Sequence, residues 1–415
     1  MSLVVQKFGG TSVKDLECMR QVMAKVKRPL SRGDKVVVVL SAMSGETNRL
    51  LAMANEWAPL PDPAEMDSLV STGEQVSVSL FAILLKSNGI RARSVLGFQA
   101  PIHTNCAYGK ARILDINAEK LHAMLEDNDV LVVTGFQGCD EYDRITTLGR
   151  GGSDTSAVAL AAALKADVCE IFTDVPGVFT TDPNICSTAR KIDRIAYDEM
   201  LEMASMGAKV LQIRSVEFAK KYNVIVHVRS TFCDQPGTIV CQEDQMEAVL
   251  VSGIAYDKDQ ARITLVHVED RPGVSAQVFS AIAQKKILVD MIVQNPSKDD
   301  KTDLTFTVPR ADLEQTLKIL ESLKYEVGYE ELRHDKHVSK ISVIGVGMRN
   351  HSGVASKAFL ALAAENINIL MISTSEIKVT CLIEEKYTEL AVRTMHKAFG
   401  LDGDGSNKTK SCKKS

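Results

Sequence analysis

The stretch KFGGTS occupies residues 7–12, and a second glycine-rich stretch, TLGRGGSDTS, occupies residues 147–156. Each stands between an apolar, strand-like run and a helical pattern. Backbone N–H groups at the start of a helix attract anions, so both stretches predict phosphate-binding turns. Neither is a Walker loop or a Rossmann turn, because the required glycine and lysine spacings are missing. One such turn alone would be an ordinary connection, but two, with Lys7 before the first and Arg150 and Asp154 in the second, favour phosphate chemistry.

The composition is that of a globular protein with more than one domain. The chain has 415 residues, of which 45% are hydrophobic and 25% charged, and its net charge is −4. This length predicts about two to four domains, and the charge gives no reason to expect nucleic acid or a membrane as partner. The longest apolar runs are too short to span a membrane and no signal segment is evident, which favours the cytoplasm. The nine cysteines include no Cys-x-x-Cys pair, so reduced thiols are expected.

Residues 1 to about 240 alternate short β-like runs with helical patterns, which is typical of an α/β fold with a mainly parallel sheet. The expected strands are Leu3–Phe8, Lys35–Leu40, Ala92–Gly97, Val130–Thr134, Val168–Thr173 and Val224–Arg229. The expected helices are Val13–Val26, Glu65–Asn88, Asp154–Lys165 and Tyr197–Tyr222.

Beyond residue 245 the sequence contains one small unit twice. Eight residues between Gly273 and Ile292 recur as identical residues 80 positions later, between Gly353 and Ile372. Each copy predicts the βαββα order of ferredoxin-like ligand-sensing modules. The expected strands are Ala261–His267, Val289–Gln294, Thr305–Val308, Lys340–Val346, Ile367–Ser373 and Lys378–Leu382. The expected helices are Val274–Lys285, Asp312–Leu323, Val354–Glu365 and Thr388–Phe399.

Two short segments lie outside these patterns. His334 and His337 stand among charged neighbours, which favours a solvated linker over a metal site. The segment 401–415 is rich in glycine, serine and lysine and is expected to be disordered.

Five motifs resemble those of the aspartate kinases in identity, order and spacing. They are KFGGTSV (7–13), STGEQ (71–75), GFQG (135–138), TLGRGGSDTS (147–156) and TDVPGVFTTDP (173–183). The resemblance implies an α/β amino acid kinase fold, a mainly parallel sheet sandwiched by helices, followed by two ferredoxin-like βαββα ACT domains. The implied boundaries are 1–245 for the catalytic domain, 246–332 and 338–400 for the ACT domains and 401–415 for a disordered tail.

The resemblance also implies an activity. Aspartate kinases transfer the γ-phosphoryl group of ATP to the β-carboxylate of L-aspartate, giving 4-phospho-L-aspartate, the first step towards lysine, threonine and methionine. The implied cofactors are ATP and Mg²⁺, with the metal held mainly by the ATP phosphates. The implied effectors are lysine, threonine or both. A homo-oligomer that pairs through its ACT domains is expected, and a shorter ACT-only chain begun at an internal methionine such as Met246 is left open.

The chemistry of the substrate explains the residues that the resemblance places around it. The β-carboxylate is already ionised at neutral pH, so no general base is needed. Arg150 suits the α-carboxylate, and Glu74 suits the α-ammonium. Lys7 and Asp154 take the catalytic roles, charge neutralisation and organisation of the transferring group. The other substrate-binding residues implied are Ser41, Thr47, Gly151, Gly152 and Ser153. Two alternatives stay open. Ser41 is only the end of a buried strand, and Asp154 is only a residue in the first turn of a helix, where the helix dipole favours a negative charge.

A further set is implied for the nucleotide: Lys7, Phe8, Gly9, Gly10, Thr173, Asp174, Phe179, Asn184 and Lys209. Two of these depart from the family. Phe179 stands where tyrosine is common, and Asn184 stands where arginine is common, which puts one nucleotide contact in doubt.

The effector set implied for the repeated unit is Asp270, Gly273, Asp290, Gln294, Asn295, Thr374, Ser375 and Glu376. The second copy lacks an aspartate that matches Asp270, so the two copies need not be equivalent sites.

Two rival functions remain at this point. One is a kinase of the same fold that acts on another carboxylate, such as glutamate, and the other is a non-catalytic amino-acid-binding regulator. Glu74, Arg150 and the doubled module argue against the first, and the intact Lys7 and Asp154 argue against the second.

Overall fold

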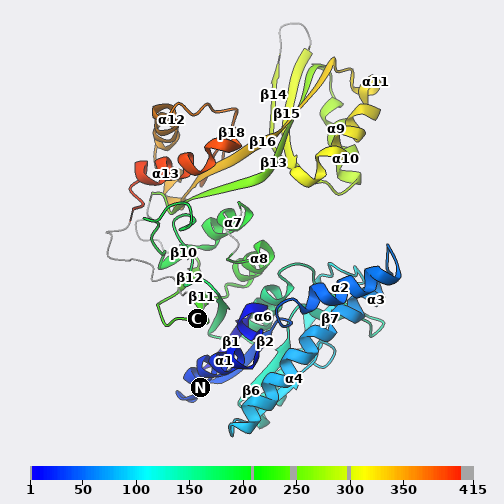
Figure 1. The fold of residues 1–415 in the computed structure, drawn as a ribbon, viewed down its shortest axis with the longest axis vertical. Helices are drawn as coiled ribbons and strands as arrows, with labels where there is room; N and C mark the ends of the chain where they lie inside the picture. Colours follow the sequence, from blue (N-terminus) through cyan, green and yellow to red (C-terminus); the bar gives the residue numbers. More distant parts are fainter. Residues whose placement is uncertain (1, 207–209, 244–249, 297–300, 403–415) are drawn as a thin grey trace. The chain divides into compact units, whose positions relative to one another are not determined.

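The computed structural model describes residues 2–206, 210–243, 250–296 and 301–402 (Figure 1). They form two compact units. The first contains the described residues of Met1–Phe179 and Lys191–Met246, and the second those of Thr180–Arg190 and Glu247–Asn407. The lysine at 209 and the residues beyond 402 lie outside the described part.

An eight-stranded, mainly parallel sheet is the centre of the first unit. Its order is β10-β12-β11-β9-β1-β2-β6-β3, and β11 with β12 is its antiparallel pair. The strands are β1 (Leu3–Phe8), β2 (Lys35–Leu40), β3 (Ala92–Val95), β6 (Val130–Thr134), β9 (Val168–Thr173), β10 (Arg194–Ala196), β11 (Val226–Ser230) and β12 (Thr238–Cys241). Strands β1 and β2 match their predicted bounds to the residue. The apolar run 36–40 marks β2, and the apolar run 3–5 begins β1.

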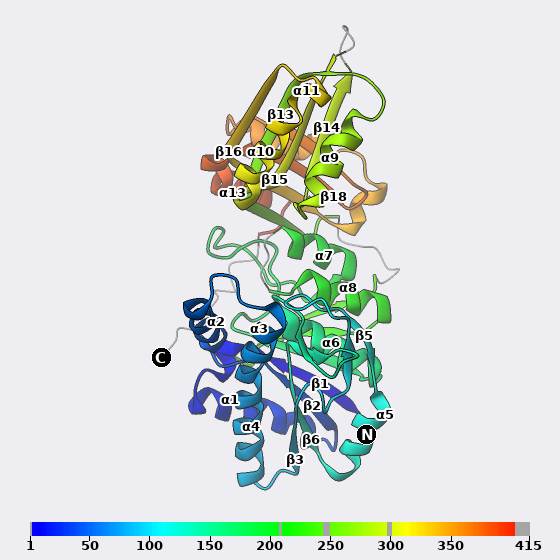
Figure 2. The same cartoon turned by 90° about the vertical axis from the view of Figure 1, so that its right-hand side faces the viewer.

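Helices cover both faces of this sheet (Figure 2). Alternate residues of β2 point to opposite faces, and Val36, Val38 and Leu40 belong to a core cluster with α1 (Leu16–Leu30) and α4 (Thr72–Ser87). Helix α6 (Gly152–Ala163) contacts β1, β2 and β9 and packs on α8 (Ile213–Tyr222). The predicted helix Tyr197–Tyr222 is instead two helices, α7 (Tyr197–Ser205) and α8.

Helix α3 (Pro63–Val70) begins at the N-cap Asp62, and Ser71 joins it to α4 with helical backbone angles. The combined span Pro63–Ser87 is long and apolar enough to cross a membrane by length and composition, which the sequence reading missed. Phe81 and Leu85 of this span are fully buried against the sheet, as in the core helix of a globular protein.

A small second sheet, β5-β4-β7-β8, was not predicted. Its strands are β4 (Ile102–Thr104), β5 (Ile113–Ile116), β7 (Gln137–Cys139) and β8 (Ile145–Thr147). Two helices were also missed, α2 (Glu46–Trp57) and α5 (Ala118–Asp127). The strands are only three or four residues long, too short to give a periodic pattern.

The second unit is built on a six-stranded antiparallel sheet with the order β14-β15-β13-β16-β18-β17. Its strands are β13 (Gly253–Glu269), β14 (Asp290–Pro296), β15 (Lys301–Pro309), β16 (Glu331–Ile344), β17 (Met371–Thr374) and β18 (Lys378–Glu384). Its helices are α9 (Val274–Gln284), α10 (Leu313–Ser322), α11 (Lys324–Val327), α12 (Val354–Ala364) and α13 (Thr388–Ala398).

The predicted repeat is visible in this unit. Gly273 and Gly353 occupy equivalent N-caps, with φ angles of +97° and +98° that favour glycine. Each copy has its own apolar core, one around α9 and one around α12.

Two long strands belong to both copies. Residues Gly253–Asp257 of β13 pair with the second half of β16, whereas Arg262–Val266 pair with its first half. The charged linker expected around His334 and His337 is therefore part of strand β16. Leu401, which the expected disordered tail included, is 2% exposed and packs in the core around α12.

Candidate active site

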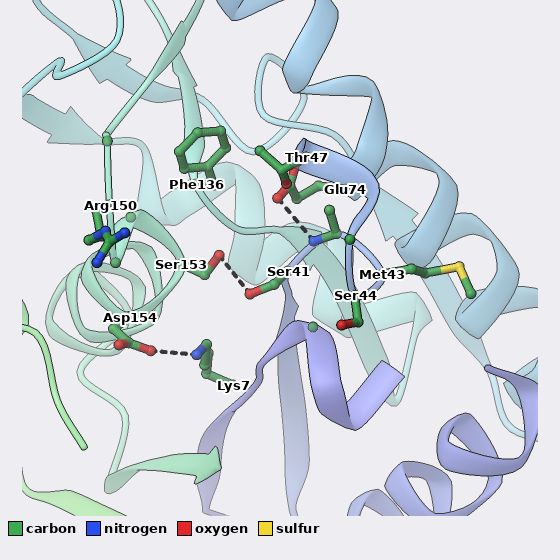
Figure 3. A pocket seen from close by; sticks show the side chains of 16 residues that line it. Lys7, Ser41, Met43, Ser44, Thr47, Glu74, Phe136, Arg150, Ser153 and Asp154 are labelled. Carbon is green, nitrogen blue, oxygen red and sulfur yellow. Dashed lines mark hydrogen bonds and ion pairs between the residues drawn. The ribbon is translucent and has the colours of Figure 1, made fainter. Parts of the chain in front are cut away.

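An open pocket of about 290 Å³ lies at the carboxyl ends of the parallel strands of the first unit. Strands β1, β2 and β6 end at the same edge of the sheet, so the segments that follow them converge there. The predicted residues that line the pocket are Lys7, Gly10, Ser41, Thr47, Glu74, Arg150, Gly151, Gly152, Ser153 and Asp154. Segments far apart in sequence are thus brought into one pocket (Figure 3).

Lys7 and Asp154 form an ion pair on one side of the pocket. Lys7 Nζ lies 2.6 Å from Asp154 Oδ1, and both side chains are largely buried. Asp154 Oδ1 is buried, so the Lys7 ammonium supplies its counter-charge. Gly10 lies close by, and a Cβ there would stand 2.8 Å from the carbonyl oxygen of Ala42, which explains the glycine.

Glu74 lies in the first turn of α4 and is 3% exposed. Its Oε1 accepts a hydrogen bond of 3.0 Å from the N–H of Ala42, and its Oε2 is buried without a partner among the residues that the structure describes. Burial raises the pKa of Glu74 to about 7. A buried carboxylate oxygen without a partner is costly, so this atom favours a ligand that brings a cation or a donor.

Arg150 lies across the pocket from Glu74 (Figure 3). It is exposed and forms no ion pair or hydrogen bond with any residue that the structure describes. The next residue, Gly151, caps helix α6 with φ +72°, and a Cβ there would stand 1.8 Å from the Gln212 side chain. The turn therefore needs glycine, and it leaves the guanidinium free for an anion.

Two serines lie between these charged groups. Ser41 Oγ donates a hydrogen bond of 2.9 Å to Ser153 Oγ, which joins the end of β2 to the first turn of α6 (Figure 3). Thr47 lines the pocket from the first turn of α2. The pocket therefore combines cationic, anionic and hydroxyl groups with a helix N-terminus, which suits an amino acid next to a phosphate group.

The sequence reading assigned no role to several residues that line the pocket: Ala42, Met43, Ser44, Gly45, Phe136 and Gly149. Phe136 has a positive φ of 68°, which is rare for a bulky residue and typical of functional sites. The motif GFQG (135–138) contains this residue, and a phenylalanine directly after a glycine was the available signal.

The expected nucleotide residues are more dispersed. Phe8 is fully buried and stacks on Phe172 at 4.6 Å, so its side chain belongs to the core. The hydroxyl of Thr173, the last residue of β9, donates a hydrogen bond of 3.1 Å to Asp174 Oδ1. Asn184 lies in the loop Thr180–Arg190, which belongs to the second unit. Gly9 is the N-cap of the turn Gly10–Val13, and Phe179 forms an isolated bridge with Lys191.

The expected effector residues all lie in the second unit. Gly273 caps α9, Asp270 precedes it, and Asn295 lies in β14. Asp290 Oδ2 pairs with the buried Lys340, and Gln294 Oε1 accepts a hydrogen bond of 2.9 Å from Ser275. The second-copy residues Thr374, Ser375 and Glu376 lie at the end of β17, and β17 contacts β14. The two halves of the expected set therefore lie on the two edge strands of the sheet, which contact each other.

One Cys–His–Asp group in the second unit has the residue types of a metal site. Its members are Cys186, His396 and Asp402. His396 Nδ1 lies 3.0 Å from Asp402 Oδ1, and Thr188 donates to the same oxygen at 2.6 Å. The donor atoms are thus already bonded to protein, as in a structural network that anchors the loop Thr180–Arg190.

Comparisons with known proteins agree with this architecture. Residues 2–230 match the amino acid kinase family, and residues 262–325 and 341–399 each match an ACT domain.

Two relatives show how far the similarity extends. The chain is 54% identical to an aspartate kinase of Pseudomonas putida over 97% of this chain and 98% of the relative. It is 50% identical to an aspartokinase of Helicobacter pylori over 96% of this chain and the whole of the relative.

Two solved structures of one enzyme are also similar. Escherichia coli aspartokinase III in complex with aspartate and ADP (R-state) has a TM-score of 0.78 and 29% identity, covering 95% of this chain and 99% of that one. The same enzyme with lysine and aspartate (T-state) has a TM-score of 0.75 and 28% identity, covering 96% and 99%.

Proposed function

Because the chain belongs to the aspartate kinase family, ATP-using phosphotransferases that act on aspartate, we propose a defined reaction for its pocket. The γ-phosphoryl group of ATP is transferred to the β-carboxylate of L-aspartate, and 4-phospho-L-aspartate is formed. The observation that carries this proposal is the arrangement of Glu74 and Arg150. Among the described residues, the buried Glu74 Oε2 has no hydrogen-bond partner and Arg150 has no ion pair, and the two side chains lie across the pocket from each other. This charge pattern complements the zwitterionic end of an amino acid.

In this assignment Glu74 binds the α-ammonium and Arg150 binds the α-carboxylate with its planar fork. The side-chain carboxylate of aspartate then points towards Lys7 and Asp154. Lys7 neutralises charge on the transferring phosphoryl group, and the N–H groups at the start of α6 orient its oxygens. Ser41, Thr47 and Ser153 supply hydroxyl donors to substrate and phosphate oxygens. Positioning, together with this neutralisation, accounts for the catalysis.

Mg²⁺ fits the same side of the pocket. The Asp154 carboxylate lines the pocket next to Lys7, and carboxylate oxygens are the protein ligands that this ion accepts alongside phosphates. The ion would be held mainly by the ATP phosphates with Asp154 beside them, and it supplies additional neutralisation of phosphate charge.

A coupled assay with hydroxamate trapping tests the reaction directly. The enzyme with MgATP and L-aspartate is expected to yield the hydroxamate of an acyl phosphate, and the reaction should stop when EDTA removes the metal. Phosphorylation of glutamate but not of aspartate would overturn the substrate assignment. Binding of both ligands without any turnover would favour a non-catalytic regulator.

The raised pKa of Glu74, about 7, predicts a pH dependence of aspartate capture. Only ionised Glu74 attracts the α-ammonium, and ionisation increases from about a tenth at pH 6 to about nine tenths at pH 8. The kcat/KM for aspartate is therefore expected to rise about tenfold between pH 6 and pH 8. Glu74→Gln should lower kcat/KM and flatten this part of the profile. A profile that Glu74→Gln leaves unchanged in shape would contradict the assignment.

We propose that lysine, threonine or both inhibit the enzyme by binding to the second unit. The support is the set of charged and polar residues on β14 and at the end of β17, two strands in contact, together with the open glycine turn at Gly273. Asp290 suits an effector ammonium, and the N–H groups of the loop suit its carboxylate. To inhibit, the effector must bind the inactive arrangement more tightly than the active one.

Substitutions at this set are expected to relieve inhibition and to spare activity without effector. Gln294→Ala is the cleaner test, because the buried Lys340 depends on Asp290 for its counter-charge and Asp290→Ala therefore needs a melting-temperature control. Typical couplings of about 1–3 kcal/mol predict a rise of about 5- to 150-fold in the effector concentration for half-inhibition. Unchanged sensitivity in a folded Gln294→Ala enzyme would remove this residue from the site. A parent enzyme that ignores both amino acids would end the feedback proposal.

The remaining features follow from the same assignment. The catalytic domain is 1–245, and the ACT domains are 246–332 and 338–400. Each ACT domain also uses part of a long strand from the other range, because β13 and β16 pair along both halves of their length. The chain works in the cytoplasm as a homo-oligomer that pairs through its ACT domains. Size-exclusion chromatography with light scattering, with and without effector, measures the oligomer.

A further inference from the structure

Asp67 is a buried carboxylate on α3 that does not line the pocket. It is 1% exposed, yet it accepts hydrogen bonds from two distant segments. The N–H of Gly109 lies 3.0 Å from its Oδ1 and 2.9 Å from its Oδ2. Thr147 donates twice, from its N–H to Oδ2 at 2.7 Å and from its hydroxyl to Oδ1 at 2.7 Å. Both oxygens are therefore fully used, and the carboxylate binds protein rather than a ligand.

These bonds hold the segment that carries Arg150. Thr147 ends strand β8, and its carbonyl accepts a bond of 2.8 Å from Ala111. Arg214 holds the same segment from another side, with bonds of 3.0 Å to the carbonyl of Leu148 and 2.8 Å to that of Ala111. The chain from Thr147 to Leu148 is thus fixed by side chains from two helices, while Arg150 itself has no partner among the described residues.

The same helical span carries the opposite end of the clamp. Helices α3 and α4 are joined through Ser71, and Glu74 lies in the first turn of α4, seven residues after Asp67. The buried side chain of Gln137 also donates to the carbonyl of Ser71 at 3.1 Å. The helical span α3–α4 therefore fixes the position of Glu74 directly. Through the bonds of Asp67, it also fixes the position of the segment that carries Arg150.

We propose that Asp67 is a positioning residue that sets the separation between Glu74 and Arg150 and so tunes the enzyme for the amino-acid substrate. The inference rests on the proposed roles of these two residues in aspartate binding. Asp67→Asn would replace one acceptor oxygen by an NH₂ group that faces N–H and O–H donors. The segment from Thr147 to Arg150 would then shift, and small misplacements of a clamp are costly in substrate binding.

The test is steady-state kinetics with both substrates varied. Asp67→Asn is expected to raise the KM for aspartate about tenfold and to leave the KM for ATP within about twofold. When Arg150 is already replaced by alanine, Asp67→Asn should change the logarithm of the KM for aspartate by less than about a third as much as it does in the parent enzyme. The reason is that both substitutions act through the same contact, that of Arg150 with the substrate. A merely structural role would lower the melting temperature and active fraction but would not give this split or this coupling.

Two further variants keep the result decisive. Thr147→Val removes one hydroxyl donor, retains the carboxylate, and should raise the KM for aspartate about threefold even if Asp67→Asn does not fold. Asp140→Asn is the matched control: Asp140 is 3% exposed and accepts bonds from the N–H groups of Tyr142 and Arg144 and from the Tyr108 hydroxyl, but none that the structure describes from residues 147–150. It should change stability without changing the KM for aspartate.

The outcomes separate the inference from the function on which it rests. If Arg150→Ala raises the KM for aspartate but folded Asp67→Asn and Thr147→Val do not, the positioning role is overturned and the clamp stands. If Arg150→Ala leaves this KM unchanged, the clamp itself is wrong, and the positioning role is overturned with it.

Discussion

Lys7→Ala is expected to lower kcat by about 100- to 1,000-fold, the usual cost of losing one preorganised charge that meets the transition state. The KM for aspartate should change little, because Lys7 lies beside Asp154 rather than between Glu74 and Arg150. Quench-flow or coupled steady-state measurements at saturating substrates report this split. A kcat within about threefold of the parent, less than ~0.7 kcal/mol of barrier, would show that the role is wrongly assigned.

A matched lysine separates this effect from general damage. Lys25 on α1 is also largely buried and pairs with an aspartate, Asp234, at 2.6 Å, but it does not line the pocket. Lys25→Ala should lower the melting temperature with kcat close to the parent. Lys7→Ala also leaves Asp154 without its cation, so some loss of stability is expected there too.

Arg150→Ala is expected to raise the KM for aspartate by about 30- to 150-fold. This range corresponds to about 2–3 kcal/mol for a bidentate, charge-assisted pair. The KM for ATP should stay within about threefold of the parent value. The melting temperature should not change, because Arg150 has no partner among the described residues that its removal would leave unpaired. Arg150→Lys should recover only part of the loss, since lysine keeps the charge without the fork.

Arg144→Ala offers the comparison. Arg144 is an exposed arginine directly before strand β8, and its ion pair with Glu65 at 2.6 Å is a surface pair. Such pairs contribute little, so both KM values should remain near those of the parent. Equal effects of Arg144→Ala and Arg150→Ala on aspartate would point to general electrostatic attraction and would contradict a specific clamp.

The parts of the fold that could be predicted are those with a strong local pattern. Strand β2 contains the apolar run 36–40 and β1 begins with the apolar run 3–5, and the 80-residue repeat reproduces the same turn at Gly273 and Gly353. The small sheet could not be predicted, because strands such as Ile102–Thr104 are too short to show a period and are held by pairing with distant residues.

The same distinction applies to the site. Lys7, Glu74, Arg150 and Asp154 stand in recognisable motifs, and the structure gathers them in one pocket. Asp67 stands in no motif, and its importance comes from contacts with Gly109 and Thr147 that no local pattern announces. The membership of the loop Thr180–Arg190 in the second unit is likewise a matter of contacts made about 200 residues away, such as that of Thr180 with His396.

The strands that run through both repeats make the second unit indivisible. Each repeat completes its sheet with part of a strand that the other repeat needs, since β13 and β16 pair along most of their length. A chain cut between the repeats would leave rows of unpaired backbone N–H and C=O groups, which promote aggregation. The repeats are therefore not independent modules, and because their sheets share strands we expect them to unfold together.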